Sequence, residues 1–404
     1  MQSMQKAIIY TGNFLFPDGN AAGKRVWGNA KAIKAAGYEV ICFCFRKDDP
    51  DSGLQKKICD DMQIYSIPYS RGIHRVNNVY PAILFRRILK EVRKMYTIDS
   101  VIMYGTLGTS GYNMAIIRFC QRLGIRLICD KVDLFDEPHK NNLLRYWLKK
   151  RDLYVMDHKI LPSCDKWIAV SDYLKKRMPD PEKTMIVPPL SVEVKRTMVA
   201  DTNQPTTIAY ASLISEKGIP VSSWKDRVDA IVDVCYVLLH VRNIPDFKMC
   251  FIGFTKDQFL GQFPEAHRAE YQDKLRVLEN HIVFYGLQSN TNAQKIISQS
   301  DFTILLRDSK TCTNAGFPTK VSESLSLGVP VIANATSDIA IYVHDMVNGC
   351  IVPDPHDIEG IADKIESLIA LTREQKDIMR TNAINDKPFY YEKYVENFKA
   401  FLMN

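Results

Sequence analysis

The chain has 404 residues, of which 46% are apolar and 25% are charged, which suits a soluble globular protein too long for a single core. No apolar run reaches the ~18–20 residues of a membrane-spanning helix, and the N-terminus lacks a small-residue cleavage site, so we expect a cytoplasmic protein without a signal peptide. The net charge of +7 is a mild excess. No basic motif is interleaved with aromatic residues, so we expect no nucleic-acid partner.

Short apolar runs alternate with helical segments through the first half of the chain. We expect helices between the runs, and the one over residues 23–37 ends on a glycine. Apolar strands separated by helices pair in parallel, so this pattern predicts a doubly wound sheet. The expected strands are residues 6–12, 39–45, 62–68, 100–105, 126–132 and 167–172.

Two of these helical segments are amphipathic and basic. The first, residues 82–96, carries Arg86, Arg87, Lys90, Arg93 and Lys94, and the second, residues 143–154, carries Arg145, Lys149, Lys150 and Arg151. They are either surface helices with solvated basic faces or a face that rests on an anionic membrane. The residues alone leave both interpretations open.

The alternation breaks at residues 188–206, a polar stretch with prolines at both ends, and then restarts. We therefore predict two consecutive doubly wound domains, residues 1–194 and 195–385, with a helix over 386–404 that packs back on the first. Their strand carboxyl ends are expected to face a shared central cleft. The strands expected in the second domain are residues 207–213, 247–254, 282–286, 301–307, 329–334 and 350–353.

The ten cysteines are scattered, and none forms a Cys-x-x-Cys pair. Cys42 and Cys44 alternate along one expected strand, so both should lie on the same face of it. Most of the others have apolar neighbours. We predict reduced structural thiols and no metal cluster.

The most informative segment is NAGFPTKVSESLSLGVPVIAN, residues 314–334. Its Gly-Phe-Pro predicts a turn that opens a helix, and Gly328 stands where a left-handed residue ends one. Lys320 and Glu323 are three positions apart near the start of that helix and share a face. Free backbone N–H groups at a helix N-terminus attract a diphosphate. Lys320 adds positive charge, and Glu323 could accept hydrogen bonds from ribose hydroxyls.

This segment resembles the family 4 retaining glycosyltransferases, whose signature is a glutamate, Gly-Phe-Gly, a second glutamate eight positions after the first, then a glycine and Pro-Val-Ile-Ala. The chain keeps the Gly-Phe, the second glutamate as Glu323, then Gly328 and Pro-Val-Ile-Ala at 330–333. Further segments resemble the family in the same order along the chain. They are residues 16–26, 127–137, 212–219 and 345–354.

The resemblance implies the GT-B fold, with two Rossmann-like domains facing a central cleft. It implies that a hexose-type sugar passes, with retention, from a nucleotide-diphosphate sugar to a glycan or lipid-linked acceptor in surface polysaccharide synthesis. No metal is expected, because basic residues and helix dipoles stabilise the leaving diphosphate. Asn20 would lie near the acceptor. The implied donor-binding residues are Gly23, Lys217, Gly218, Arg307, Gly316, Phe317, Pro318, Thr319, Lys320 and Glu323.

The sugar-contacting positions depart from the family pattern. The first glutamate falls at Ala315, and we expect Asn314 to replace it in the catalytic site as a neutral hydrogen-bonding group. The histidine that often precedes the N-domain aspartate falls at Val132, while Asp133 remains. Asp133 either orients the acceptor hydroxyl or holds a neighbouring backbone N–H at a strand end. We interpret the changes as a different donor sugar or a separate subfamily.

The phosphate-binding positions also depart. The arginine that accompanies Lys217, five positions before it, falls at Ser212. Arg307, at the end of an expected strand, either supplies that positive charge or forms a surface ion pair with Asp308.

Other functions remain as alternatives. One is a non-catalytic sugar-nucleotide-binding partner of an active transferase. Another is a GT-B-fold nucleotide-sugar epimerase, which would need acidic and histidine residues around the sugar. No Gly-x-Gly-x-x-Gly follows an expected strand, which disfavours a nicotinamide oxidoreductase. A lipid-linked acceptor would place the chain peripherally on the cytoplasmic membrane face.

Overall fold

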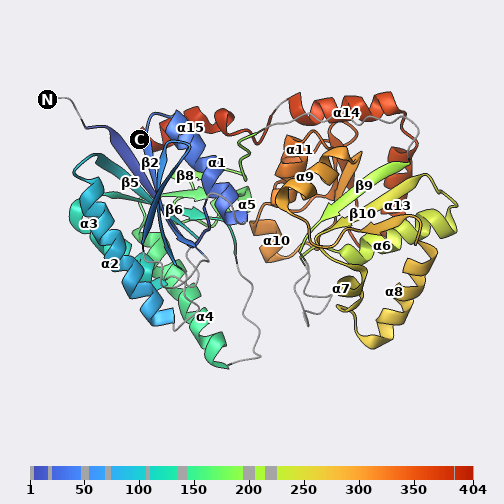
Figure 1. Ribbon diagram of the computed structural model, residues 1–404, viewed down its shortest axis with the longest axis horizontal. Coiled ribbons are helices and arrows are strands. Elements are labelled where there is room, and N and C mark those ends of the chain that lie inside the picture. Colours follow the sequence, from blue (N-terminus) through green and yellow to red (C-terminus); the bar gives the residue numbers. More distant parts are fainter. Residues whose placement is uncertain are drawn as a thin grey trace. The chain divides into compact units, whose positions relative to one another are not determined.

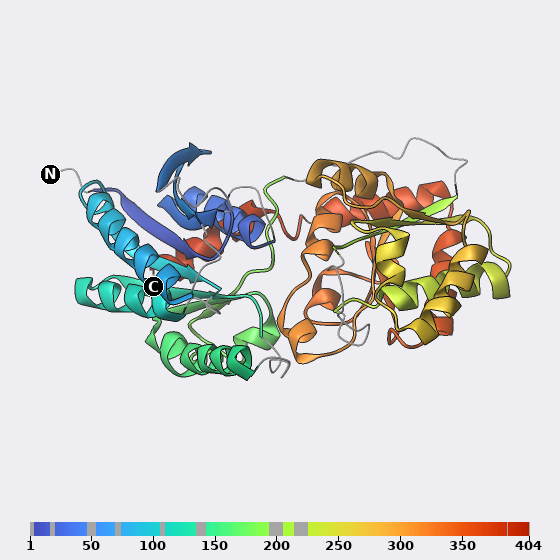
Figure 2. The ribbon, with the colours of Figure 1, turned by 60° about the horizontal axis from the view of Figure 1, so that its bottom comes forward.

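The computed structural model contains two compact units, drawn in Figures 1 and 2. Unit 1 comprises Met1–Val192, Ala315–Phe317 and Phe389–Asn404, and unit 2 comprises Glu193–Asn314 and Pro318–Pro388. The end of the chain therefore returns to the first unit. The structure describes residues 4–16, 21–46, 54–68, 74–105, 110–134, 143–193, 205–213, 225–385 and 387–403.

The sheet of unit 1 has the strand order β3-β4-β2-β1-β5-β6-β7-β8. Every neighbouring pair is parallel except β3 and β4. The chain builds outward in both directions from β1, as in a doubly wound sheet. The strands are β1 (Lys6–Gly12), β2 (Glu39–Arg46), β3 (Gln55–Cys59), β4 (Met62–Pro68), β5 (Thr97–Tyr104), β6 (Arg126–Lys131), β7 (Lys166–Ala169) and β8 (Thr184–Ile186).

The strands that were expected in this sheet pair in parallel, as predicted, but one edge carries an additional strand that was not expected. There β3 runs antiparallel to β4. The two strands are joined by Asp60 and Asp61, whose φ angles are 50° and 57°, a two-residue hairpin turn of the left-handed kind. Because β3 reads QKKIC and is largely exposed, it has no apolar run by which the sequence could have marked it.

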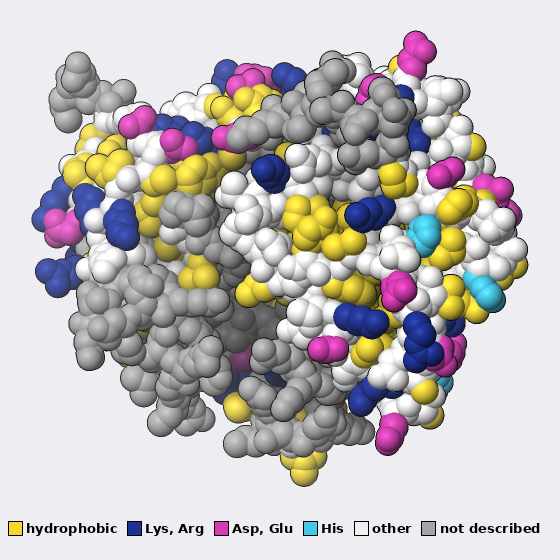
Figure 3. Space-filling model, turned by 45° about the vertical axis from the view of Figure 1, so that its right-hand side comes forward, with side chains coloured by type: hydrophobic (Ala, Val, Ile, Leu, Met, Phe, Trp, Pro, Cys, Tyr) yellow, Lys and Arg dark blue, Asp and Glu magenta, His cyan; other side chains and the backbone are white. Residues whose placement is uncertain are grey.

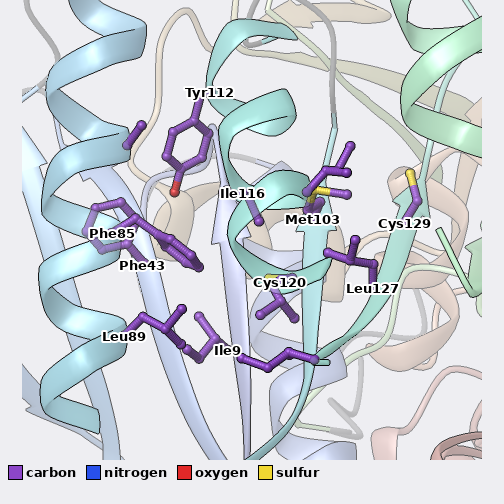
Figure 4. Close-up of a cluster of buried hydrophobic side chains, with 14 of the residues drawn as sticks. Ile9, Phe43, Phe85, Leu89, Met103, Tyr112, Ile116, Cys120, Leu127 and Cys129 are labelled. Atoms are coloured by element: carbon purple, nitrogen blue, oxygen red, sulfur yellow. The ribbon is translucent and has the colours of Figure 1, made fainter. Parts of the chain in front are cut away.

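Helices cover both faces of the unit 1 sheet, and the alternation of each strand decides which residues meet them. Ile9, Phe43 and Met103 point to the face covered by α2 and α3, where they pack with Phe85 and Tyr112 (Figure 4). The opposite face packs against α1 and α15. The helices are α1 (Ala21–Ala35), α2 (His74–Val92), α3 (Ser110–Leu123), α4 (Leu143–Val155), α5 (Asp172–Lys175) and α15 (Val395–Met403), with short π and 3-10 turns at Met156–Ile160 and Leu161–Ser163.

The end of the chain differs from the single helix expected over residues 386–404. Phe389 and Tyr391 instead bond to Ser191, which donates to the Phe389 carbonyl (2.7 Å) and accepts from the Tyr391 N–H (3.1 Å). This pairing holds the backbone extended. A 3-10 turn at Tyr391–Tyr394 follows, and only Val395–Met403 is α-helical.

Unit 2 contains a six-stranded, fully parallel sheet of order β11-β10-β9-β12-β13-β14. The helices α9, α11 and α14 lie on one face, and α6, α8 and α13 lie on the other (Figure 1). The strands are β9 (Thr206–Ala211), β10 (Phe247–Ile252), β11 (Ile282–Phe284), β12 (Phe302–Leu305), β13 (Val331–Asn334) and β14 (Gly349–Val352). The helices are α6 (Val228–Tyr236), a π turn (Val237–Val241), α7 (Lys256–Leu260), α8 (Glu265–Val277), α9 (Asn290–Gln299), α10 (Thr311–Ala315), α11 (Thr319–Ser326), α12 (Ile339–Tyr342), α13 (Ile358–Ile369) and α14 (Arg373–Asn385).

The ten cysteines are free thiols, and eight of them are buried, as predicted. Cys42 and Cys44 lie in the same core cluster and therefore on the same face of β2. Among the described helices, none combines the length and the apolar character needed to cross a bilayer.

Candidate functional site

In the unit 2 sheet, the order in which the chain adds strands reverses between β9 and β12. From β9 the sheet continues through β10 and β11, whereas from β12 it continues through β13 and β14. Ligands of open parallel sheets bind beyond the strand carboxyl ends at such a point. Tyr210 lies near the end of β9, and Arg307 follows β12 by two residues. The two side chains therefore flank the place where this fold binds ligands.

The helix α11 begins at the same edge of the sheet. Pro318 is its N-cap, with φ −74° and ψ 117°, and its missing N–H costs nothing there because that group would have no helical partner. Gly328 follows the last turn with φ +69°, and a side chain at that position would overlap Ile384. The predicted left-handed helix end is thus confirmed. Lys320 stands in the first turn of this helix.

Four side chains form what we call the Asp226 cluster: Tyr210, Asp226, Arg307 and Lys320. The Arg307 Nε donates to Asp226 Oδ1 over 2.8 Å, and the Tyr210 hydroxyl donates to Asp226 Oδ2 over 2.9 Å. The Lys320 ammonium also bonds to Oδ2 and lies 4.4 Å from the centre of the Tyr210 ring. One carboxylate thus holds two cations.

The charge of Asp226 is stabilised by these neighbours. Burial alone would raise its pKa, but Lys320 and Arg307 outweigh burial, and the pKa of Asp226 lies well below its usual range. Asp226 is therefore ionised at neutral pH. Two cations and one carboxylate leave a net charge of +1, and 29% of the Lys320 side chain is exposed. The cluster can receive an anion from solvent.

Asn334, the last residue of β13, fixes the backbone of Arg307. Its amide oxygen accepts from the Arg307 N–H and its amide nitrogen donates to the Arg307 carbonyl, both over 2.8 Å. Of the two interpretations of Arg307, the ion pair with Asp308 is wrong, because Arg307 pairs with Asp226. Asp308 instead contacts Arg227 at 3.3 Å and Lys310 at 3.0 Å.

Several other predicted residues belong to unit 2. Glu323 and Lys320 both line a cavity of about 50 Å³ between α11 and the sheet, so they share a helix face as predicted. Asn314 ends the unit 2 part of α10, where its amide donates to Ser309 (2.9 Å) and accepts from the Ser337 N–H (3.4 Å). Thr319 opens α11. Lys217 and Gly218 lie outside the described residues.

The remaining predicted residues belong to unit 1. Gly316 and Phe317 group with it, and the Phe317 ring packs on Phe389 with 5.6 Å between ring centres. Gly23 is buried in the first turn of α1. Asp133 follows β6 by two residues, and its charge acts on Lys131 and Tyr104. Asn20 lies outside the described residues.

Unit 1 has a polar cluster of its own, which we call the Asp130 cluster: Tyr10, Arg25, Asn29 and Asp130. Arg25 of α1 pairs with Asp130 of β6 at 2.7 Å, with 3% and 0% of their side chains exposed. The Tyr10 hydroxyl donates to Asp130, Asn29 donates to Tyr10 (3.0 Å), and Arg25 also donates to the Val187 carbonyl (2.7 Å). This cluster ties α1 to the sheet and is closed to solvent.

The sequence did not reveal Tyr210, Asp226 or Asn334 as site residues. Asn334 ends a strand that was expected, so its position at the carboxyl edge was available as a signal. Tyr210 fell in the middle of the strand expected over residues 207–213. The two cations that pair with Asp226 are 81 and 94 residues away in the sequence. No local pattern marks it.

A family model supports what this geometry indicates. Residues 198–386 match the model of the glycosyl transferases group 1, and this match includes the whole Asp226 cluster. Residues 198–386 are therefore similar to the group 1 glycosyltransferases. No curated protein sequence matches this chain.

Solved structures similar to this chain show its fold. HepE from Anabaena in complex with UDP has 12% identity and a TM-score of 0.65, covering 98% of this chain and 99% of that one. Sucrose-phosphate synthase from Thermosynechococcus elongatus has 15% identity and a TM-score of 0.64, covering 99% and 98%. The lipopolysaccharide outer core galactosyltransferase WaaB has 16% identity and a TM-score of 0.61, covering 99% of both chains. The chain thus has two Rossmann-like domains of the GT-B type.

Proposed function

We propose that the chain is a retaining glycosyltransferase that moves a hexose-type sugar from a nucleotide-diphosphate sugar to a glycan or lipid-linked acceptor, in the synthesis of a surface polysaccharide. The observation that carries the proposal is the pair of cations, Lys320 and Arg307, at the carboxyl edge of the unit 2 sheet. The HepE structures with UDP and with UDP-glucose support a donor of this class.

The donor diphosphate is the ligand that suits these groups. Backbone N–H groups in the first turn of α11 attract phosphate oxygens, and Lys320 and Arg307 supply positive side chains. We assign Lys217 and Gly218 to the same phosphates, and Glu323 to the ribose hydroxyls. The negative charge of the diphosphate grows as the sugar departs, so the cations stabilise the transition state more than the bound substrate.

The reaction exchanges one bond at the anomeric carbon for another on the same face of the sugar. The bond to the donor phosphate oxygen breaks, and a bond to the acceptor oxygen forms. The acceptor proton passes to the leaving phosphate, so the products are a glycoside and a nucleoside diphosphate. We assign Asp133 to the orientation of the acceptor hydroxyl and Asn314 to contact with the donor sugar, while the side-chain cations do the work that a metal ion does in other transferases.

A lipid-linked acceptor would bring the chain to the cytoplasmic face of a membrane as a peripheral protein. The basic helices α2 and α4 support this contact. Their exposed cations include Arg86, Arg87, Lys149 and Lys150.

The first experiment is a thermal-shift screen against uridine, guanosine, adenosine and cytidine diphosphates and their sugar conjugates. A ligand at 100 times its Kd stabilises the folded state by about 2.7 kcal/mol. Release of nucleoside diphosphate in the presence of an acceptor then identifies transfer. Stabilisation with no turnover would favour the non-catalytic partner, and formation of an epimeric donor would favour the epimerase.

The variant Lys320→Met tests the placement of the donor site. We expect kcat/KM to fall on the order of 10²–10³-fold, because one transition-state contact is lost. Lys364→Met is the matched control, because Lys364 pairs with Asp345 (2.8 Å) on the surface of the same unit. Equal activity of the two variants would show that the donor phosphates bind elsewhere.

A further inference from the structure

A groove of about 750 Å³ lies among α2, α3 and α4 of unit 1. These helices run near one another on one side of unit 1 in Figure 2. A volume of this size is typical of sites that bind a ligand rather than a solvent molecule. Most of its lining is apolar, with Val79, Ile83, Met114, Ala115, Phe119 and Val155.

Large apolar side chains are exposed to solvent in this groove and elsewhere on its helices. Ile83 of α2 lines the groove, and 60% of its side chain is exposed. Val79 and Tyr80 of α2, and Trp147 and Tyr154 of α4, are exposed as well. Apolar surface that gathers in one place usually marks an interaction site.

Two arginines lie at the groove. Arg86 lies 5.7 Å from the centre of the Phe119 ring, and no carboxylate within the described residues pairs with it. Arg151 contacts Asp152 at 3.2 Å, but that carboxylate also accepts the Ser110 hydroxyl over 2.6 Å. The positive charge of the groove is therefore only partly compensated by the protein.

The helices around the groove extend this positive charge. Basic and acidic side chains are interspersed on the face of the molecule drawn in Figure 3. By contrast, residues 79–92 and 146–155 together contain six lysines and arginines and two acidic residues. An apolar groove inside a basic surface matches an amphiphile that has a hydrocarbon chain and an anionic head.

We propose that this groove binds the hydrocarbon chain of a membrane lipid whose phosphate lies at Arg86 and Arg151. The chain replaces water over the apolar lining, and the two guanidinium groups bond to the phosphate oxygens. This inference deepens the membrane contact of the proposed function. It uses no donor-site residue, so its failure and a failure of the donor proposal are distinguishable.

The test uses decyl phosphate below its micelle concentration, measured by isothermal titration calorimetry. Glycerol 3-phosphate supplies the head without the chain, and octyl glucoside supplies a chain without the charge. We expect decyl phosphate to bind with one molecule per protein chain and each of the two controls to bind at least tenfold more weakly. Glycerol 3-phosphate binding as tightly as decyl phosphate would reduce the site to a phosphate site and overturn the proposal.

Matched variants locate the site. Arg86→Gln should weaken decyl phosphate binding about fivefold, which is the contribution of one basic residue near an anionic lipid. Its control is Arg118→Gln, because Arg118 is an exposed residue of α3 outside the groove lining. The control should not weaken binding. Ile83→Glu should abolish binding, and Leu123→Glu, an equal change at another exposed apolar residue, should not. Binding of the nucleoside diphosphate identified in the thermal-shift screen, measured on the same samples, should be unaffected by all four.

The same variants are then tested on vesicles of phosphatidylglycerol and phosphatidylcholine. Co-sedimentation should fall for Arg86→Gln and Ile83→Glu and stay at the wild-type level for the two controls. If the groove variants and their controls bind decyl phosphate and vesicles equally, the groove is not the lipid site. If no lipid probe binds at all, the proposal is wrong.

Discussion

Each unit places a tyrosine from its first strand against an aspartate that also pairs with an arginine. The two sets are Tyr10, Asp130 and Arg25 in unit 1, and Tyr210, Asp226 and Arg307 in unit 2. In unit 1 the charges balance, and at most 3% of either ionic side chain is exposed. In unit 2 a second cation, Lys320, is added, and 29% of its side chain is exposed.

This difference separates a structural ion pair from a binding site. The N–H groups of the Arg25 guanidinium donate hydrogen bonds to Asp130 and to the Val187 carbonyl. In a buried pair of this kind, the hydrogen bonds between the two partners offset the cost of desolvation. The charges of the two partners cancel, so no net charge remains to bind a ligand. In the Asp226 cluster the positive charge exceeds the negative charge, and solvent reaches the excess. Stoichiometry and exposure, rather than residue type, therefore indicate which cluster binds an anion.

The largest expected effect comes from removing the cation of the buried Asp130 cluster. Arg25→Met leaves Asp130 as an unpaired buried carboxylate, so we expect the free energy of unfolding of unit 1 to fall by about 3–5 kcal/mol. Denaturant unfolding measures the loss. Hydrogen exchange assigns it, because peptides from β1 and β6 should lose protection while peptides from β9 keep it.

The double variant Arg25→Met/Asp130→Leu is the control for this prediction. Because it removes both charges, it should recover much of the stability that the single variant loses. A loss below about 1 kcal/mol in the single variant, as for a surface pair, would mean that Asp130 is not sealed from water. The contrast between the two units would then fail.

The next effect comes from removing the carboxylate of the open cluster. Asp226→Asn raises the net charge of the cluster from +1 to +2, so we expect nucleoside diphosphate to bind about fivefold more tightly at low salt, with the gain screened at high salt. We also expect a loss of about 2 kcal/mol of unfolding free energy, because hydrogen bonds to a charged group are weakened. Calorimetry at two salt concentrations and denaturant unfolding measure the two quantities.

The control for this variant is Asp345→Asn, which removes a carboxylate from a surface pair in the same unit. It should change neither nucleotide affinity nor its salt dependence. If Asp226→Asn instead weakens nucleotide binding, Asp226 acts by orienting Lys320 and Arg307 rather than by limiting their charge.

The sequence predicted the buried strands of both sheets because each is an apolar run between helices. It did not predict β3 and β8, which are short and lie at the sheet edges, and β3 is polar. It extended the last helix too far, because Phe389 and Tyr391 pair with Ser191, about 200 residues earlier in the chain. Contacts of that range leave no local pattern.

The candidate site divides in the same way. Lys320 and Glu323 were predicted because the signals for the start of a helix are a few consecutive residues of the sequence. Arg307 was placed correctly at a strand end, but its partner was not, because Asp226 reaches it from a segment 81 residues away. The counter-charge that sets the net charge of the site was thus invisible until the fold brought it there.

The smallest effect concerns acid pH. Burial raises the pKa of Asp226, but Lys320 and Arg307 lower it by a larger amount. In the folded protein this pKa therefore lies below the ordinary value of 3.8. The ion pairs therefore stabilise unit 2 above that ordinary value, and this contribution is lost as the pH falls through the lower folded value. The stability difference between wild type and Asp226→Asn should stay constant from pH 7 to about 5 and shrink below about 4. Urea unfolding across this range measures it. A difference that persists undiminished at the lowest pH at which unit 2 folds would mean that the amide disturbs packing, and that the charge of Asp226 contributes little to the open cluster.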